Sequence, residues 1–350
     1  EGTMDAITQL RNLTQKQCYI SGISAIVTDT KVLVEQEMFI YVCIAALVSI
    51  VVLSLLMDSY LISIFFMLSI GMAIIYNLGS NFVVGEISYL TKALAAVLQL
   101  GVTMDYSIFL WHSFEEELEK HDGDSKSAMA NAIAATISSV VSSSITTVAG
   151  FIALCFMSFT LGLDLGIVMA KGVILGVISC VTVLPAFILV FNKAIQKTKH
   201  KHLLPDFKKI PVWITKHYRI FIVLFLLLIG PAAYGQANTN VYYDLTLSLP
   251  ESLKSVTAQN KVADTYDLGS ANMILISSDT KMKDVKDLLS DVNDVKGVKV
   301  AMGLESFLDG SVPDSFIPED LTSALKSEKH EMLIFMSEYK TGSDEANAQC

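Results

Sequence analysis

The sequence predicts a membrane-embedded, all-α bundle of six transmembrane helices followed by a partial extracytoplasmic α+β domain. Of its 350 residues, 52% are hydrophobic, and the mean hydropathy of +0.52 exceeds that of a typical soluble protein. Several apolar runs reach about 20 residues, the length that spans a bilayer. After residue 238 these runs give way to alternating apolar and polar residues, which is typical of strands.

The predicted spans are separated by polar or charged segments. They cover residues 38–57, 61–79, about 90–112, 134–158, 164–191 and 218–237. The connection between the first two is so short, Met57 to Tyr60, that we expect these spans to form a tight antiparallel pair. Residues 113–133 are predicted to form a surface helix broken by a polar turn at 121–125.

The distribution of charge predicts the orientation in the membrane. Residues 192–219 contain seven Lys and one Arg against a single Asp, and short basic loops lie in the cytoplasm. Six crossings then place 113–130 and 192–217 in the cytoplasm, and 1–37 and 238–350 outside. The outer segment 238–350 is acidic, with 19 Asp and Glu against 10 Lys. We therefore expect a multi-pass protein of the cell membrane with no nucleic-acid partner.

The C-terminal segment has the pattern of a β-α-β unit. Residues 272–277 and 298–301 are predicted strands on either side of an amphipathic helix at 281–292, and 332–336 is a further strand. The five cysteines are scattered without metal-ligand or disulfide spacing. We therefore expect no metal site and no cofactor. There is also no phosphate-binding glycine loop, so we expect no use of ATP by this chain.

Asp105 is the strongest candidate for a functional residue, because it lies within the apolar run of the third predicted span. An Asp at mid-bilayer costs roughly 2.5–3.5 kcal/mol on translocon scales, and such residues often carry protons or ions. Gly101 precedes it by one helical turn and leaves room beside the carboxylate. Tyr106 follows it, and its hydroxyl could bond to a neighbouring helix or order a water chain. As an alternative, Tyr106 is an aromatic filler of the core.

The fourth predicted span carries eight hydroxyl residues in the twelve positions 136–147. Ser139, Ser143 and Thr146, with Thr147 beside them, give one small, hydrogen-bonding helix face. This face either supports a proton path or packs against another helix, and both roles are compatible. Lys171, like Lys92, is a further candidate for an intramembrane charge, although both side chains are long enough to reach the membrane surface.

Three stretches resemble the MMPL (mycobacterial membrane protein large) branch of the resistance-nodulation-division transporters. They are Gly101-Val-Thr-Met-Asp-Tyr-Ser-Ile-Phe-Leu110 with the following Glu115-Glu-Glu-Leu118, Ser144-Ile-Thr-Thr-Val-Ala-Gly-Phe151, and Asp164-Leu-Gly-Ile-Val-Met-Ala-Lys-Gly-Val173 ending in Leu184-Pro185. The resemblance covers about residues 38–240. It implies twelve spans in two halves, each with a large extracytoplasmic porter domain, and export of lipids or other hydrophobic molecules driven by protons that pass through Asp-Tyr pairs.

On this resemblance, residues 1–37 end the first porter domain, 38–191 form a five-helix core, 192–217 form a basic cytoplasmic linker, 218–237 form a further span, and 238–350 begin the second porter domain. The chain would be a fragment with the family's second to seventh spans. Asp105 and Tyr106 would form the proton relay, with a second pair in the missing half of the protein. The implied partners are protons, membrane lipids and a hydrophobic substrate. Monomers and homo-oligomers are both compatible with the sequence.

The sequence departs from the family at one place and leaves two other functions open. Family members often carry an Arg just before the acidic cluster, where this chain has Ser113 and Phe114, so the expected cytoplasmic ion pair lacks its cation. An intramembrane aspartyl protease would need a second intramembrane Asp, and Asp58 and Asp164 lie at span ends. A sterol-sensing or receptor-like module, or an accessory of protein secretion, could use the same scaffold. We expect a secondary active transporter, not an enzyme.

Overall fold

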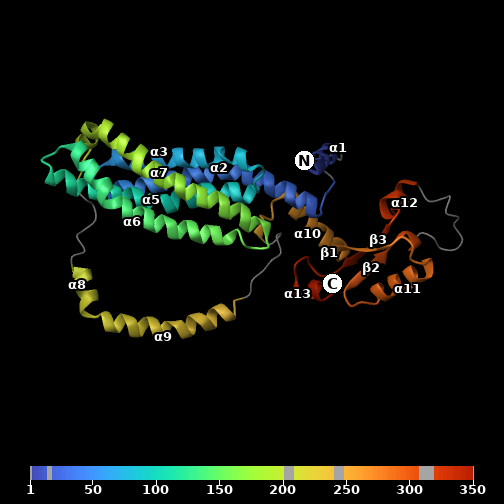
Figure 1. The fold of residues 1–350 in the computed structure, drawn as a ribbon. Coiled ribbons are helices and arrows are strands. Elements are labelled where there is room, and N and C mark those ends of the chain that lie inside the picture. Colours follow the sequence, from blue (N-terminus) through green and yellow to red (C-terminus); the bar gives the residue numbers. More distant parts are fainter. Residues whose placement is uncertain (1, 14–17, 201–208, 240–247, 307–318, 350) are drawn as a thin grey trace. The chain divides into compact units, whose positions relative to one another are not determined.

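The computed structural model describes residues 2–13, 18–200, 209–239, 248–306 and 319–349 (Figure 1). The chain divides into two compact units. One consists of residues 1–30 and 222–350, and the other of residues 31–221. Each unit has its own hydrophobic core.

The described residues include six helices that are long and apolar enough to cross a membrane. They are α2 (Ile23–Leu56), α3 (Tyr60–Gly79), α5 (Tyr89–Lys120), α6 (Ser125–Leu154), α7 (Thr160–Lys197) and α9 (Tyr218–Ala237). Two short helices, α4 (Asn81–Val84) and α8 (Lys209–Lys216), lie between them. The six predicted spans are therefore confirmed as helices, although α6 ends at Leu154, before the predicted end of the fourth span at residue 158. Several helices are longer than the predicted spans, because a helix can continue beyond the apolar residues that cross the bilayer.

The polar turn between α5 and α6 is confirmed, but the predicted surface helix at 113–133 is not a separate element, because its two parts continue α5 and begin α6. Asp122 and Gly123 have positive φ angles of 49° and 88°, which end α5 because such backbone cannot continue a right-handed helix. Asp124 then caps α6, since its carboxylate accepts hydrogen bonds from Lys126 N at 3.2 Å and Ser127 Oγ at 2.6 Å.

In the unit of residues 31–221, α7 packs against α3, α5 and α6 (Figure 1). Helix α3 packs mainly on α7 and α5 and makes few contacts with α2. The expectation of a tight pair between the first two spans is therefore wrong. The physical reason is that the polar groups of α3 have their partners on α7. Ser69 Oγ lies 2.9 Å from Ser179 Oγ, and Asn77 Nδ2 donates to Val168 O at 3.1 Å.

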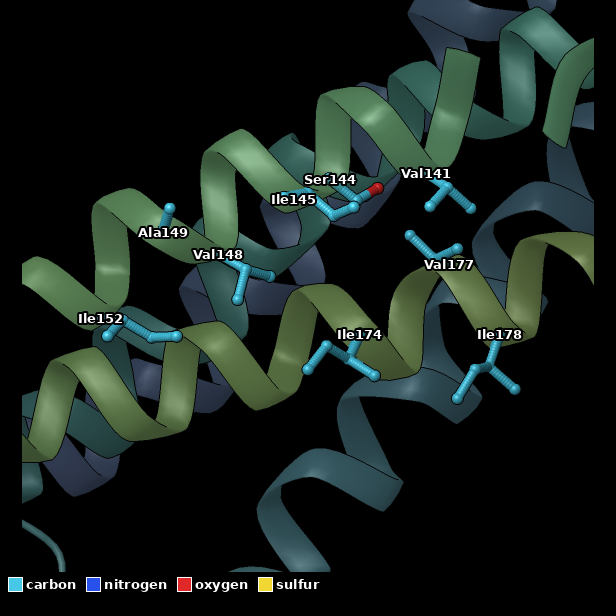
Figure 2. A pocket seen from close by; sticks show the side chains of 9 residues that line it. All are labelled: Val141, Ser144, Ile145, Val148, Ala149, Ile152, Ile174, Val177 and Ile178. Atoms are coloured by element: carbon cyan, nitrogen blue, oxygen red, sulfur yellow. The ribbon is translucent and has the colours of Figure 1, made fainter. Parts of the chain in front are cut away.

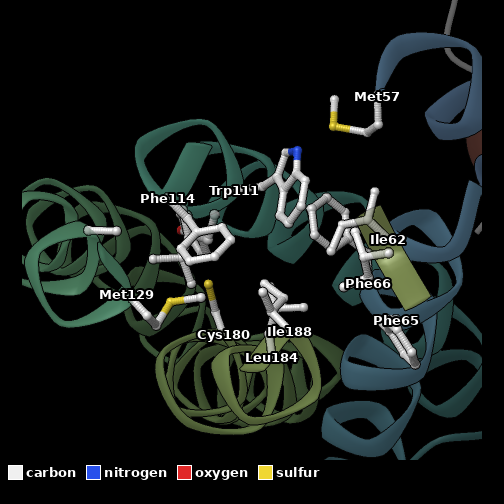
Figure 3. Packing of buried hydrophobic residues seen from close by; sticks show 14 of the residues in the cluster. Met57, Ile62, Phe65, Phe66, Trp111, Phe114, Met129, Cys180, Leu184 and Ile188 are labelled. Atoms are coloured by element: carbon white, nitrogen blue, oxygen red, sulfur yellow. The ribbon is translucent and has the colours of Figure 1, made fainter. Parts of the chain in front are cut away.

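The core of this unit is aromatic and aliphatic. Figure 3 shows Trp111 and Phe114 of α5 above Leu184 and Ile188 of α7. These four side chains are fully buried. The Trp111 and Phe114 ring centroids lie 5.6 Å apart and the ring planes are tilted by 44°, a centroid distance within the range of aromatic pairs. This cluster holds the part of α5 that lies just before its acidic residues 115–117.

Close helix contact depends on small residues of α7. A Cβ added to Gly176 would overlap the side chain of Thr103 on α5, and Thr103 is held because its hydroxyl donates to Gln99 O at 2.7 Å. We therefore expect Gly176→Ala to lower the free energy of unfolding, measured by denaturation in detergent, by about 1–3 kcal/mol. Gly150→Ala on α6 is the matched control, because nothing lies within 4 Å of its added Cβ. Equal stability of both variants would contradict a tight contact between α5 and α7.

The other unit contains a three-stranded sheet with the order β1-β3-β2. The strands are β1 (Ser270–Ser277), β2 (Val298–Met302) and β3 (His330–Ser337), and β3 is antiparallel to both neighbours. The predicted strands and the helix between them, α11 (Met282–Asn293), are confirmed. The β-α-β unit is a split one, because β3 lies between β1 and β2. Val285 and Leu289 of α11 are buried with Leu333 and Phe335 of β3.

The same unit includes α1 (Gly2–Leu13), the first turns of α2, α10 (Lys254–Tyr266), α12 (Glu319–Leu325) and α13 (Asp344–Gln349). Asp29 of α2 joins two of these helices. Its carboxylate pairs with Arg11 of α1, with Oδ2 at 2.9 Å from Nη2, and it also accepts from Ser255 N at the start of α10 at 2.9 Å. The N-terminal residues thus pack with the C-terminal part of the chain.

Candidate functional site

Helix α5 places the carboxylate of Asp105 near the middle of a long apolar helix. Ser88 caps the helix, with its hydroxyl accepting from Leu90 N at 3.3 Å. Asp105 is 16 residues after Tyr89 and 15 before Lys120, or about 24 Å and 22 Å along the axis at 1.5 Å per residue. This position agrees with an intramembrane carboxylate.

Asp105 and Tyr106 point in different directions. Asp105 is exposed, whereas Tyr106 is only 7% exposed and belongs to the core cluster of this unit. Adjacent residues of a helix are about 100° apart around its axis, because one turn takes 3.6 residues. The structure therefore does not bring the two predicted relay residues together. The Tyr106 ring packs in the core, as the alternative interpretation of this residue expects.

Small side chains are exposed one turn before Asp105 on α5 and along α6. Gly101, one turn before Asp105, is also exposed, and a Cβ added there would meet nothing within 4 Å. Ser139, Ser143 and Thr146 of α6 are exposed as well. Both the carboxylate and the hydroxyl-bearing face of α6 thus lie on the outside of the bundle formed by residues 31–221. Exposed small and polar residues at membrane depth are typical of a helix-packing surface.

Two of the predicted supporting hydroxyls are satisfied within α6. Thr146 Oγ1 donates to Ser143 O at 2.7 Å, and Thr147 Oγ1 donates to the same carbonyl at 3.1 Å. A threonine hydroxyl that donates to its own helix can still accept one further hydrogen bond. Thr146 and Thr147 can therefore accept a hydrogen bond from a protonated group, but their own hydroxyl hydrogens are already donated to Ser143 O.

Lys171 does not lie near Asp105 along the membrane normal. Its ammonium donates to Asn81 Oδ1 of α4. Asn81 follows the end of α3 and precedes Ser88, the cap at the start of α5, by seven residues. Lys171 thus interacts near the predicted outer end of the bundle, as expected for a side chain that reaches toward the membrane surface.

Sequence reasoning missed a buried amide pair that links three helices. Asn77 Nδ2 of α3 donates to Gln99 Oε1 of α5 at 2.9 Å, and Gln99 Nε2 donates to Gly172 O of α7 at 3.0 Å. Both side chains are fully buried. The signal in the sequence was an amide residue inside each of two apolar spans, because buried amides need partners across helices.

A paired-aspartate site like that of a protease is not formed by these helices. Asp164 Oδ2 accepts from Ser88 N at 3.2 Å, so it lies level with a residue about 25 Å along α5 from Asp105. Asp58 lies at the other end, beside Glu115, about 15 Å along the helix from Asp105. Two carboxylates that share a reaction must approach within hydrogen-bond reach of one substrate. The described residues also contain no group of three His, Cys, Asp or Glu suited to a metal.

An apolar groove of about 380 Å³ lies between α6 and α7. Figure 2 shows Val177 of α7 pointing toward Val141 of α6, with Val148 and Ile174 also pointing into the space between the helices. Ser144 is the one polar residue of the lining, and its hydroxyl donates to Val140 O of its own helix. The groove is thus apolar enough to contact a hydrocarbon chain, and its lining contains no titratable group.

Six apolar helices that are long enough to cross a membrane, together with a small α+β region, indicate a multi-pass membrane protein. The model of the MMPL family matches residues 1–217, more than half of the chain. The chain belongs to the MMPL family, and the resemblance of the three sequence stretches is confirmed.

The chain is similar to several bacterial proteins. It is 26% identical over 308 residues to the apo-petrobactin exporter of Bacillus anthracis, covering 80% of this chain and 41% of that protein. It is 25% identical over 249 residues to the membrane protein SCO0839 of Streptomyces coelicolor, covering 69% and 35%. It is 32% identical over 126 residues to the membrane protein ActII-3 of the same organism, covering 36% and 17%. The chain spans less than half the length of each of these relatives.

Proposed function

We propose that the full-length protein exports lipids or other hydrophobic molecules across the cell membrane, driven by protons that move inward through Asp105. The observation that carries the proposal is the exposed carboxylate of Asp105 in mid-helix, beside Gly101 and outside the packed core. An ionised Asp in contact with lipid costs roughly 2.5–3.5 kcal/mol by translocon scales. The proposal therefore requires that another membrane segment covers this face.

The proposed partner is a helix from the other half of the full-length protein, which would supply a second relay carboxylate. Gly101 leaves room for its backbone, and Ser139 and Ser143 offer hydroxyls to it. In the proposed cycle Asp105 takes a proton from the extracytoplasmic side, becomes neutral, and later releases the proton toward the cytoplasm. The neutral and charged forms favour different packing across this face, because only the charged form needs polar partners.

Export is also the activity in the name of one relative, the apo-petrobactin exporter. The lipid substrate is the part of the proposal that rests on the family resemblance. The apolar groove between α6 and α7 is compatible with a hydrocarbon chain but has no polar group that would select one.

Transport in vesicles tests the proposed energy source. We expect the full-length protein in proteoliposomes to move a fluorescent lipid analogue when a pH gradient is imposed, without ATP, and we expect a protonophore to stop the movement. Vesicles that contain no protein give the background rate. Movement that persists after the protonophore, or that requires ATP, would contradict the proposal.

A further inference from the structure

Three segments that are distant in the sequence meet in a charged cluster at the predicted cytoplasmic end of the bundle. Lys199, just after α7, lies with Nζ 2.9 Å from Asp58 Oδ2 and 3.1 Å from Glu115 Oε1. Asp58 belongs to the short connection between α2 and α3, and Glu115 lies near the end of α5. Lys199 thus provides a cation to the acidic run of α5 from a position far along the chain.

Backbone contacts hold the cluster in place. Ser59 and Lys199 form an isolated antiparallel bridge, and His200 N donates to Asp58 O at 2.7 Å. Ser59 Oγ lies 2.7 Å from Thr198 Oγ1. The connection at 57–60 is therefore joined to residues 198–200, and Lys199 is positioned by the chain on both sides of it.

Two buried polar atoms at this corner have no hydrogen-bond partner among the described residues. Asp58 is 7% exposed, and its Oδ1 has no hydrogen-bond partner among the described residues. The same holds for Nε1 of the fully buried Trp111. Figure 3 shows the indole nitrogen on the side of the ring that faces Met57, the neighbour of Asp58. Buried polar atoms without a protein partner are rare, and their presence favours a functional explanation.

The cluster contains two carboxylates and one ammonium, so it is neutral only when it holds one additional proton. Burial raises the pKa of Asp58, but hydrogen bonds from Glu115 and Lys199 and the charge of Lys199 hold it below its usual range. A carboxyl group donates to a carboxylate only when it carries a proton. Burial and the neighbouring Asp58 carboxylate raise the pKa of Glu115 to about 7, whereas the pKa of Asp58 is lowered. Glu115 is therefore the member of the pair that is expected to bind the additional proton near neutral pH.

The charged groups that act on Glu115 are Asp58 and Lys199. Burial lowers the pKa of Lys199, but its two carboxylate partners more than offset this and raise it, so Lys199 stays charged. His200 and Tyr60 are further titratable side chains of this corner, and their rings pack with centroids 4.2 Å apart. On α5 itself, Glu116 and Glu119 are exposed.

We propose that Asp58, Glu115 and Lys199 form a proton-exchange site, in which the Glu115 carboxylate binds one proton and releases it to water at the cytoplasmic end. The inference rests on the proposed function, because it gives protons that pass Asp105 a group from which to leave. Glu115 is ten residues after Asp105 on α5, or about 15 Å along the helix. This separation excludes direct transfer, so the two carboxylates act in separate steps.

The titration of Glu115 tests the site. We expect infrared difference spectra of the full-length protein in vesicles to show a protonated carboxyl band that titrates near neutral pH and is lost in Glu115→Gln. We also expect Glu115→Gln to change the pH profile of transport. Glu119→Gln removes a carboxyl group from the exposed face of the same helix and should leave the band and the profile unchanged. A band and a profile that survive in Glu115→Gln would overturn the proposal.

Lys199 variants keep the test decisive if Glu115→Gln does not fold. Lys199→Met removes the cation that favours the ionised carboxylate, so the band should titrate at higher pH, and Lys199→Arg should restore it. An unmoved band in Lys199→Met would also overturn the site. Asp105→Asn should stop transport and leave this band intact. If the proposed function is wrong, transport would be independent of protons and the Glu115 band would be normal. If the proton-exchange site is wrong, transport would be driven by protons and the Glu115 band would be absent.

Discussion

Asp105→Asn should abolish proton-driven transport by the full-length protein. Asparagine has the same shape as aspartate, but its side-chain amide does not bind and release a proton near neutral pH. We expect the rate of transport under a pH gradient to fall by about 100-fold or more, the loss typical when a proton-transferring side chain is removed. Vesicle assays of lipid movement and of proton uptake, made on the same preparation, would measure both halves of the coupled process.

The same substitution should not unfold the protein. Asp105 is exposed and outside the core cluster, and a neutral amide costs less than a carboxylate in the membrane. Denaturation in detergent should therefore give an unchanged or slightly higher stability. Asp122→Asn is the matched control, because Asp122 lies in the turn before α6 with φ 49°, which asparagine also adopts readily. Transport at the normal rate in Asp105→Asn would remove this residue from the mechanism.

Much of the fold could be predicted from local pattern. The six spans follow from apolar length, and the turn at 121–124 follows from its polar residues. The strands at 270–277 and 330–337 follow from alternation. Their order in the sheet could not be predicted in the same way, because β3 pairs with both β1 and β2 from a position further along the chain. Such pairing depends on the packing of α11 against one face of the sheet and not on local preference.

The candidate site was predictable in part. The membrane cost of a carboxylate identified Asp105, and helical spacing identified the small face of α6 that the structure leaves exposed. The direction of Tyr106 into the core could not be predicted, because it depends on which face of α5 packs against α7. Lys199 could not be assigned to Glu115 from the sequence either, since 84 residues separate them.

Truncation of Trp111 is the second substitution for which we expect a large effect, here on stability. The Trp111 side chain is fully buried, its ring packs with Phe114, and both belong to the same buried cluster as the apolar residues of α7 labelled in Figure 3. We expect Trp111→Ala to lower the free energy of unfolding by about 3–5 kcal/mol, because it removes a large buried side chain and leaves a cavity. Denaturation of the full-length protein in mixed detergent would measure this change.

Trp111→Phe is the informative comparison. The indole nitrogen has no hydrogen-bond partner among the described residues, so phenylalanine loses ring volume but leaves no donor or acceptor unpaired. We expect this variant to lose clearly less stability than Trp111→Ala. A loss as large as that of the alanine variant would mean that the nitrogen has a partner whose loss is costly. Because Asp58 Oδ1 is the unpartnered acceptor at the same end of the bundle, such a result would connect Trp111 to the proton-exchange site.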